Sequence, residues 1–76
     1  PSSIGREVDL YLLAELYDNV EYEPEQFPGV IIKLGEGKPT ILLFKNGKLI
    51  CAGARSEKDV EAALDELEKL IENASK

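Results

Sequence analysis

Residues 29–54 read GVIIKLGEGKPTILLFKNGKLICAGA, and this stretch decides the fold. Three runs rich in aliphatic and β-branched residues alternate with the polar segments GEGK and KNGK, which is the pattern of neighbouring strands joined by turns. Asn46-Gly47 predicts a hairpin with a type I′ turn, because both central residues of that turn need a positive φ. We expect strands within 29–34, 39–45 and 48–54, preceded by a fourth within 19–24.

Helical patterns lie on both sides of these strands. After them, Ser56 and Asp59 have the spacing of a capping box at the start of a long helix. Before them, Asp9 is the expected N-cap of a shorter helix that ends near Tyr17. The apolar stripes are Val60, Ala63, Leu64, Leu67, Leu70, Ile71 and Ala74 in the long helix and Leu10, Leu13, Ala14 and Tyr17 in the short one. The element order predicts an α+β domain, with an antiparallel sheet of about four strands and two helices packed on one face.

Size and composition narrow the class of protein. With 76 residues we expect residues 1–76 to form a single domain, near the lower size limit for an unaided core. One cysteine, Cys51, excludes an internal disulfide, and the absence of His removes the usual zinc-ligand spacings, so no cofactor is expected. The sequence has no membrane-length apolar run, which predicts a soluble, unanchored protein. Because the chain has no Met and starts at Pro1, we expect a trimmed, processed or engineered segment.

Charge is distributed unevenly along the chain, whose net charge is −6. Residues 1–28 carry seven acids and one base, residues 29–55 one acid and five bases, and residues 56–76 seven acids and three bases. A net charge of −6 taken whole argues against nucleic-acid binding. The middle third, which contains the expected strands, is nevertheless locally basic.

Two helices can cover only one face of such a sheet, so the other face should be polar if water covers it. Strict alternation instead leaves this outer face apolar in the middle and basic at its borders. The residues expected to point outward are Phe27, Ile31, Lys33, Thr40, Leu42, Phe44, Lys48, Ile50 and Ala52. An uncovered patch of this kind indicates an interface, or a surface that another chain or a second copy buries as core.

Nothing in the sequence indicates an enzyme. There is no His, and Cys51 is expected to point into the core, where a thiol behaves as a small apolar group. The clustered carboxylates lie on amphipathic helix faces, where acids are ordinarily solvated, and GEG and NGK are expected to be hairpin turns rather than phosphate-binding loops.

Three segments resemble one repeat of the TATA-box-binding protein family, most closely the archaeal second repeat: EYEPEQFPGV, ILLFKNGKLICAGA and RSEKDVEAALDEL. IGREVDL resembles the start of that repeat's first helix. In this family, two repeats form a saddle whose concave sheet lies on the minor groove of DNA. Pairs of Phe side chains insert between base steps and kink the duplex, and the family is a standard example of this mode of binding. The resemblance implies a half saddle that binds A·T-rich DNA in the cytoplasm of an archaeal-like cell without a nucleus.

The resemblance also implies roles for individual residues. Phe27 and Phe44 match the two wedge positions, and Glu23 and Glu25 match the acidic tip of a loop that meets a transcription factor B-type partner. For these two acids, ordinary solvated charge remains the alternative. The remaining outer-face positions match apolar groove contacts at Leu42 and Ile50, a neighbouring position at Thr40, and basic positions near phosphate at Lys33 and Lys48.

Departures from the family pattern weaken the expected activity. Only Pro1-Ser2-Ser3 precedes IGREVDL, so we expect the repeat's first strand, like the second repeat, to be lacking. Ala52 stands where the family usually has a groove-contacting Thr. The loss of the first strand would leave the strand within 48–54 as a sheet edge that invites a homodimer. Two alternatives to DNA binding stay open: an engineered or reconstructed scaffold with no activity of its own, and a protein-interaction module that uses the acidic loop and the helices.

Overall fold

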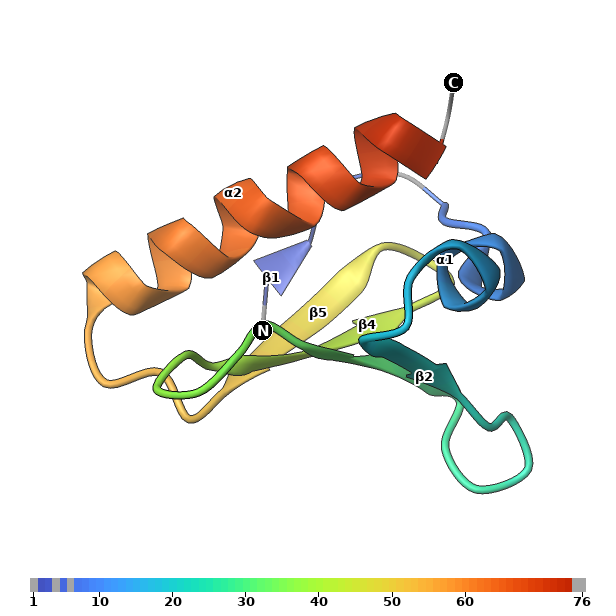
Figure 1. Ribbon diagram of the computed structural model, residues 1–76, viewed down its shortest axis with the longest axis horizontal. Coiled ribbons are helices and arrows are strands. Elements are labelled where there is room, and N and C mark those ends of the chain that lie inside the picture. The colour runs from blue at the N-terminus through green and yellow to red at the C-terminus, as the bar shows by residue number, and fades with distance from the viewer. Residues whose placement is uncertain (1, 4, 6, 75–76) are drawn as a thin grey trace.

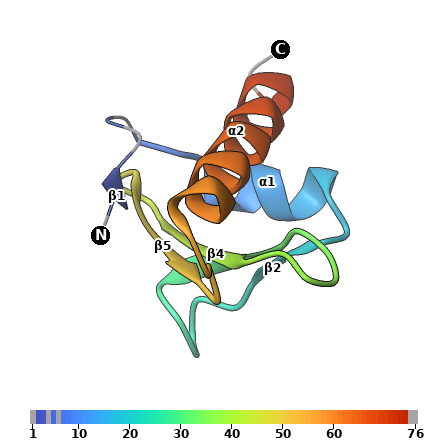
Figure 2. The same ribbon diagram turned by 90° about the vertical axis from the view of Figure 1, so that its left-hand side faces the viewer.

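The computed structural model describes residues 2–3, 5 and 7–74. In this structure, two helices cover one face of a β-sheet (Figures 1 and 2). All strand pairs in the sheet are antiparallel, in the order β1-β5-β4-β3-β2. The expected α+β class is confirmed. The elements are β1 (Ser2–Ser3), α1 (Leu10–Leu16), β2 (Val20–Tyr22), β3 (Gly29–Lys33), β4 (Thr40–Phe44), β5 (Lys48–Ala52) and α2 (Glu57–Ala74).

Alternation along the strands determines which residues enter the core. In β4, Ile41 and Leu43 are fully buried, whereas the residues on either side of them are only half-buried. The same alternation holds in β3 and β5, as predicted, because successive side chains of a strand point to opposite faces. The core therefore lies between the sheet and the helices and consists of Val8, Leu10, Leu13, Val20, Val30, Ile32, Ile41, Leu43, Leu49, Ala63, Leu67 and Ile71.

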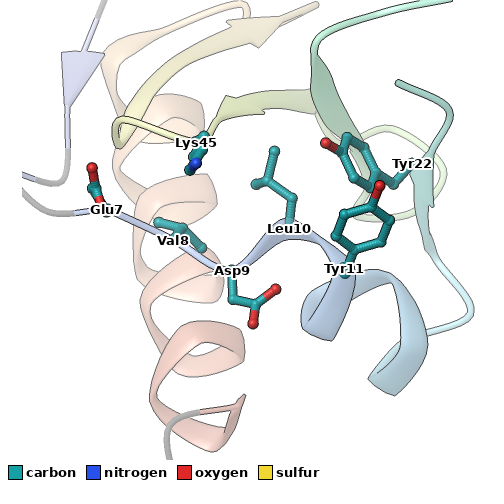
Figure 3. A pocket seen from close by; sticks show the side chains of 7 residues that line it. All are labelled: Glu7, Val8, Asp9, Leu10, Tyr11, Tyr22 and Lys45. Carbon is teal, nitrogen blue, oxygen red and sulfur yellow. The ribbon is translucent and has the colours of Figure 1, made fainter. Parts of the chain in front are cut away.

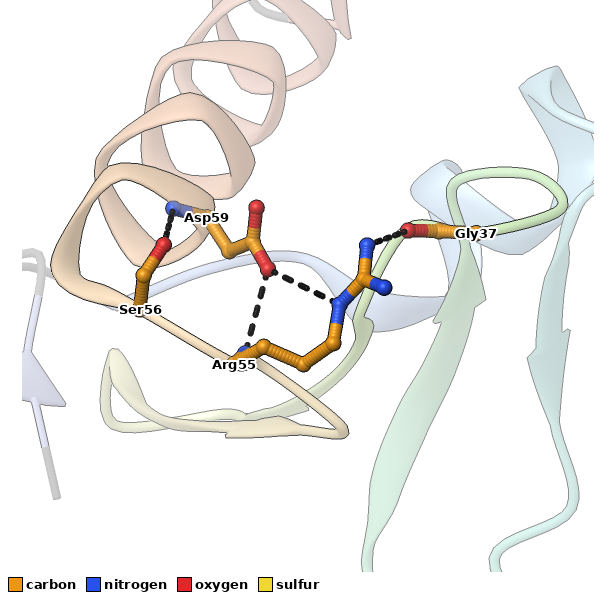
Figure 4. A network of polar contacts seen from close by, with 4 residues as sticks. All are labelled: Gly37, Arg55, Ser56 and Asp59. Atoms are coloured by element: carbon orange, nitrogen blue, oxygen red, sulfur yellow. Dashed lines mark hydrogen bonds and ion pairs between the residues drawn. The ribbon is translucent and has the colours of Figure 1, made fainter.

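The start of α2 is capped and tied to the loop between β3 and β4 (Figure 4). The Ser56 hydroxyl accepts a hydrogen bond from the Asp59 amide at 3.3 Å, as a capping residue should. The Asp59 carboxylate accepts from the Arg55 amide at 3.1 Å and lies 3.6 Å from the Arg55 Nε. The Arg55 guanidinium in turn donates to the Gly37 carbonyl at 3.3 Å. About two turns farther along α2, Glu66 pairs with Lys38 of the same loop at 2.9 Å. We call these contacts the β3–β4 clasp.

Helix α1 begins where the sequence predicted. Asp9 is its N-cap, and its carboxylate accepts a hydrogen bond from the Leu12 amide at 3.1 Å. Leu10 and Leu13 are buried, and Ala14 and Tyr17 pack against the core, so the expected stripe is confirmed. Neither described helix is long and apolar enough to cross a membrane.

The turn between β4 and β5 differs from the expected type I′ geometry. Its loop has three residues, Lys45-Asn46-Gly47, and the Gly47 amide donates to the Phe44 carbonyl at 2.9 Å. Gly47 has a φ of +90°, whereas no described non-glycine residue, Asn46 included, has a positive φ. This is the pattern of a three-residue hairpin that ends in a left-handed glycine. Asn46 instead uses its side-chain oxygen to accept from the Lys48 amide at 3.0 Å.

The expectation that the first strand is lacking, with β5 as a bare sheet edge, needs correction. Ser2 and Ser3 form the two-residue strand β1, which pairs with β5 opposite Leu49 and Lys48. The sheet therefore has five strands, four of which are those expected. The reason is that strand pairing uses backbone groups, which two serines supply as well as any apolar pair does.

Candidate nucleic-acid interface

The outer face of the sheet, opposite the helices, brings the predicted DNA-binding residues together. An apolar row crosses three strands, because Ile31 lies opposite Leu42 and Leu42 lies opposite Ile50. Ile31 and Leu42 are half-buried, and Ile50 is 46% exposed. A second row places Thr40 between Lys33 and Ala52. Alternation and register thus assemble these six residues from three strands on one surface.

Phe27 and Phe44 form an aromatic pair on this face. Their ring centroids are 5.4 Å apart and the ring planes meet at 52°. Both side chains are half-buried, and at this separation each ring shields part of the other. A tilted pair at this separation is a favourable aromatic arrangement. The two predicted wedge residues are therefore neighbours, and they lie beside the apolar row, because Phe44 is two residues beyond Leu42 along β4.

Gly29 makes this arrangement possible, and its role was missed from the sequence. It lies opposite Phe44 in the register and has outer-face parity, yet it is buried. A Cβ built at this position would lie 3.1 Å from Cε2 of Phe27 and 2.6 Å from the Leu43 carbonyl oxygen. The missing side chain leaves the space that the Phe27 ring occupies. Pro28-Gly29 was visible in the sequence, but only the β3–β4 register reveals what the glycine permits.

The border of the outer face is not purely basic, which corrects the sequence expectation. Glu21 of β2 lies opposite Ile31 and therefore on the same face. Its carboxylate is 3.4 Å from the Lys33 ammonium, and both side chains are more than half exposed. An exposed pair of this kind contributes roughly 0–1 kcal/mol. Glu21 nevertheless sets a negative charge beside one of the two lysines expected to approach phosphate.

The acidic loop between β2 and β3 is a defined turn. The Glu23 carbonyl accepts hydrogen bonds from the amides of Gln26 and Phe27, each at 2.9 Å. The side chains of Glu23 and Glu25 are exposed. The loop projects from one end of the sheet (Figure 1), so these acids are set apart from the apolar row of Ile31, Leu42 and Ile50. The turn also fixes the backbone of Phe27 at the point where the chain returns to the sheet.

Cys51 lies on the helix side of β5, half-buried, and packs against the core. Burial raises the pKa of its thiol. A thiol held protonated is a poor nucleophile. Among the described residues, no group of three or more His, Cys, Asp or Glu is placed to hold a metal ion.

A family model described as transcription factor TFIID, or TATA-binding protein, matches residues 2–74. The TATA-box-binding protein of Methanothermococcus thermolithotrophicus is 44% identical over 73 residues, which are 96% of this chain and 40% of the relative. That of Pyrococcus furiosus is 53% identical over 64 residues, covering 84% of this chain and 34% of the relative.

A solved structure, Methanococcus jannaschii TBP, superimposes with a TM-score of 0.90 at 36% sequence identity. The match covers 96% of this chain and 43% of that one. The chain thus spans about 40% of the length of the relatives it matches, which corresponds to a single repeat.

Proposed function

The chain belongs to the TATA-binding protein family, and on that premise we propose that its outer sheet face binds the minor groove of A·T-rich DNA. The observation that carries the proposal is the Phe27–Phe44 pair, which stands on an uncovered apolar face with 5.4 Å between its ring centroids. Side chains inserted between base steps unstack them and kink the duplex, as this family itself exemplifies.

The rest of the face suits the same ligand. The minor groove of A·T pairs displays hydrogen-bond acceptors only, and its floor and sugar walls tolerate apolar contact. The row of Ile31, Leu42 and Ile50 supplies that contact, and Thr40 is the polar member beside it. Lys33 and Lys48 lie at the ends of their strands, where a positive charge can approach phosphate.

Binding is expected to be weak. One pair of wedges unstacks DNA at a cost of roughly a few kcal/mol per base step, a value for which this family is the standard example. A single repeat has half of the contacts that offset this cost. Because part of the affinity comes from released counterions, it falls as salt rises. Sequences that kink easily, such as those with TA steps, cost less to deform and are preferred.

The test is a fluorescence titration of a labelled TATA duplex at two salt concentrations. Phe27→Ala and Phe44→Ala are each expected to weaken binding roughly tenfold or more, since an aromatic ring stacked on a base contributes about 1–3 kcal/mol. Leu16→Ala is the matched control, because Leu16 is 51% exposed and lies on α1, away from the outer face. No binding by the parent chain at tens of micromolar, or equal loss in the control, would sink the proposal.

The acidic loop is proposed as a protein contact of the transcription factor B type, through Glu23 and Glu25. In its support, the turn that presents these two exposed acids is held by the hydrogen bonds of the Glu23 carbonyl. A Glu23→Gln, Glu25→Gln double variant should lose a basic partner of this class in a pull-down while keeping its DNA affinity. Retention of the partner would contradict this assignment.

We also propose that, in the absence of DNA, the apolar outer face of one chain packs against a second copy of the chain to form a homodimer. The apolar row of Ile31, Leu42 and Ile50 crosses this face, and Ile50 is 46% exposed. An uncovered apolar surface favours association. Sedimentation equilibrium at high micromolar concentration should show a dimer, and a clean monomer would exclude it.

A further inference from the structure

A hollow on the opposite side from the proposed DNA face has no role in that proposal. It has a volume of about 440 Å³ and is lined by Glu7, Val8, Asp9, Leu10, Tyr11, Tyr22 and Lys45 (Figure 3). It is the size of a pocket that accepts one large side chain or a small ligand. Its lining comes from the segment before α1, from α1, from β2 and from the β4–β5 turn.

The hollow has an apolar floor and an aromatic wall. Val8 and Leu10 belong to the core and form its base. The rings of Tyr11 and Tyr22 meet edge to face, with their centroids 4.8 Å apart. Tyr11 is 66% exposed, the largest exposed fraction among the bulky apolar and aromatic side chains that the structure describes. An exposed Tyr beside an apolar floor offers a large contact area at a low cost in side-chain entropy.

Charge around the hollow selects the kind of partner. Of the described residues that line it, Glu7 and Asp9 are acidic and Lys45 is basic. From Glu7 to Ile32 the sequence holds seven acids and no base, and this stretch forms α1, β2 and the acidic loop at one end of the molecule (Figure 1). When a partner places one side chain in the hollow, the residues on either side of that side chain therefore lie close to carboxylates of this chain. Complementary charge raises the rate of association and suppresses acidic partners.

We propose that this hollow is a docking site for a basic protein segment. One aromatic side chain of the segment packs against the wall formed by Tyr11 and Tyr22 and on the floor formed by Val8 and Leu10. The flanking Arg or Lys side chains of the segment pair with Glu7 and Asp9. Asp9 caps α1 through one carboxylate oxygen, and a carboxylate has a second oxygen that can accept. The site is separate from the outer sheet face, so the inference does not rest on DNA binding.

The test uses the whole chain labelled with ¹⁵N and three synthetic pentapeptides. The first has one Trp between two pairs of Arg, the second replaces the Arg residues with Glu, and the third replaces the Trp with Gly. The basic Trp peptide is expected to give saturable shifts of the Val8, Tyr11 and Tyr22 amides, and each of the other two to bind at least about tenfold more weakly. Equal binding of the acidic peptide, or shifts centred on Phe27 and Phe44, would overturn the proposal.

Two variants sharpen the experiment. Tyr11→Ala removes a largely exposed ring, so the fold should be kept, and it should weaken the basic Trp peptide several-fold. Leu16→Ala is the matched control, because it removes an exposed apolar side chain from the same helix outside the hollow. Unchanged affinity in Tyr11→Ala, or an equal loss in both variants, would exclude the hollow as the site.

Discussion

The hydroxyl of Tyr17 donates a hydrogen bond to the backbone carbonyl of Leu70 at 2.9 Å, and this contact joins the end of α1 to the last turns of α2. The ring of Tyr17 also packs against the core, so this side chain contributes both an apolar contact and a hydrogen bond. The two helices are 53 residues apart in sequence at this contact. The bond therefore fixes a tertiary relationship that no local pattern could reveal.

Replacement of Tyr17 by Phe should lower the free energy of unfolding by about 1 kcal/mol, because the ring stays and one partly buried hydrogen bond is lost. In a domain of this size, that corresponds to a fall in Tm of about 4–8 °C. Thermal unfolding followed by circular dichroism measures it. Tyr11→Phe is the control, since Tyr11 is largely exposed, and its Tm should stay within about a degree. A Tyr17→Phe variant as stable as the parent would show that the bond contributes nothing net.

Gly29→Ala should destabilise the chain by about 1–3 kcal/mol, the usual cost of forcing extra volume into a packed site. The added methyl group meets the Leu43 carbonyl oxygen at 2.6 Å and displaces the Phe27 ring. Urea denaturation gives the energy, and the ring-proton shifts of Phe27 and Phe44 report the displacement. Gly53→Ala provides the contrast: its Cβ has open space and a φ of +84°, so it should cost backbone strain without moving either ring.

Glu21→Gln should strengthen DNA binding about two- to fivefold if the outer face binds phosphate as proposed. The carboxylate lies 3.4 Å from the Lys33 ammonium, so its removal leaves that charge to the DNA. The slope of log affinity against log salt should steepen by up to about one, the contribution of one phosphate contact. Glu15→Gln, an exposed acid on α1, should change neither quantity. Equal effects of the two changes would mean that only net charge matters.

The Cys51 thiol should titrate at a higher pH in the folded chain than in the unfolded one, because burial raises its pKa. Its alkylation by iodoacetamide should then be slower in buffer than in concentrated urea, with a reactivity midpoint shifted upward. The sign for stability follows: above the unfolded pKa, only the unfolded thiol ionises freely, so this group lowers stability as pH rises. A midpoint that does not change between the two states would contradict the burial effect.

Much of the fold was predictable because local periodicity and packing agree. Ile41 and Leu43 alternate with Thr40, Leu42 and Phe44, so the buried and exposed faces of β4 followed directly. The caps Asp9 and Ser56 were visible for the same reason, since each makes its hydrogen bond within three residues. Phe27 and Phe44 could be assigned to one face from the same alternation.

Features that depend on register or loop length could not be predicted. Glu21 reaches the outer face because it pairs with Ile31, and no local signal gives the offset between β2 and β3. The Asn46-Gly47 turn differs from the expected type because β4 ends at Phe44, which leaves three residues rather than two in the loop. Ser2 and Ser3 form a strand although they have no apolar pattern, because their backbone pairs with β5.

The β3–β4 clasp has a mechanical consequence. It ties the start of α2 to the β3–β4 loop through Arg55 and Asp59 and the middle of α2 to the same loop through Lys38, while Tyr17 bonds to Leu70 near the other end. A helix fastened near both ends acts as a strut along the back of the sheet. These contacts oppose bending of the sheet away from the helix. If the outer face binds DNA as proposed, we expect the duplex to deform more than the sheet.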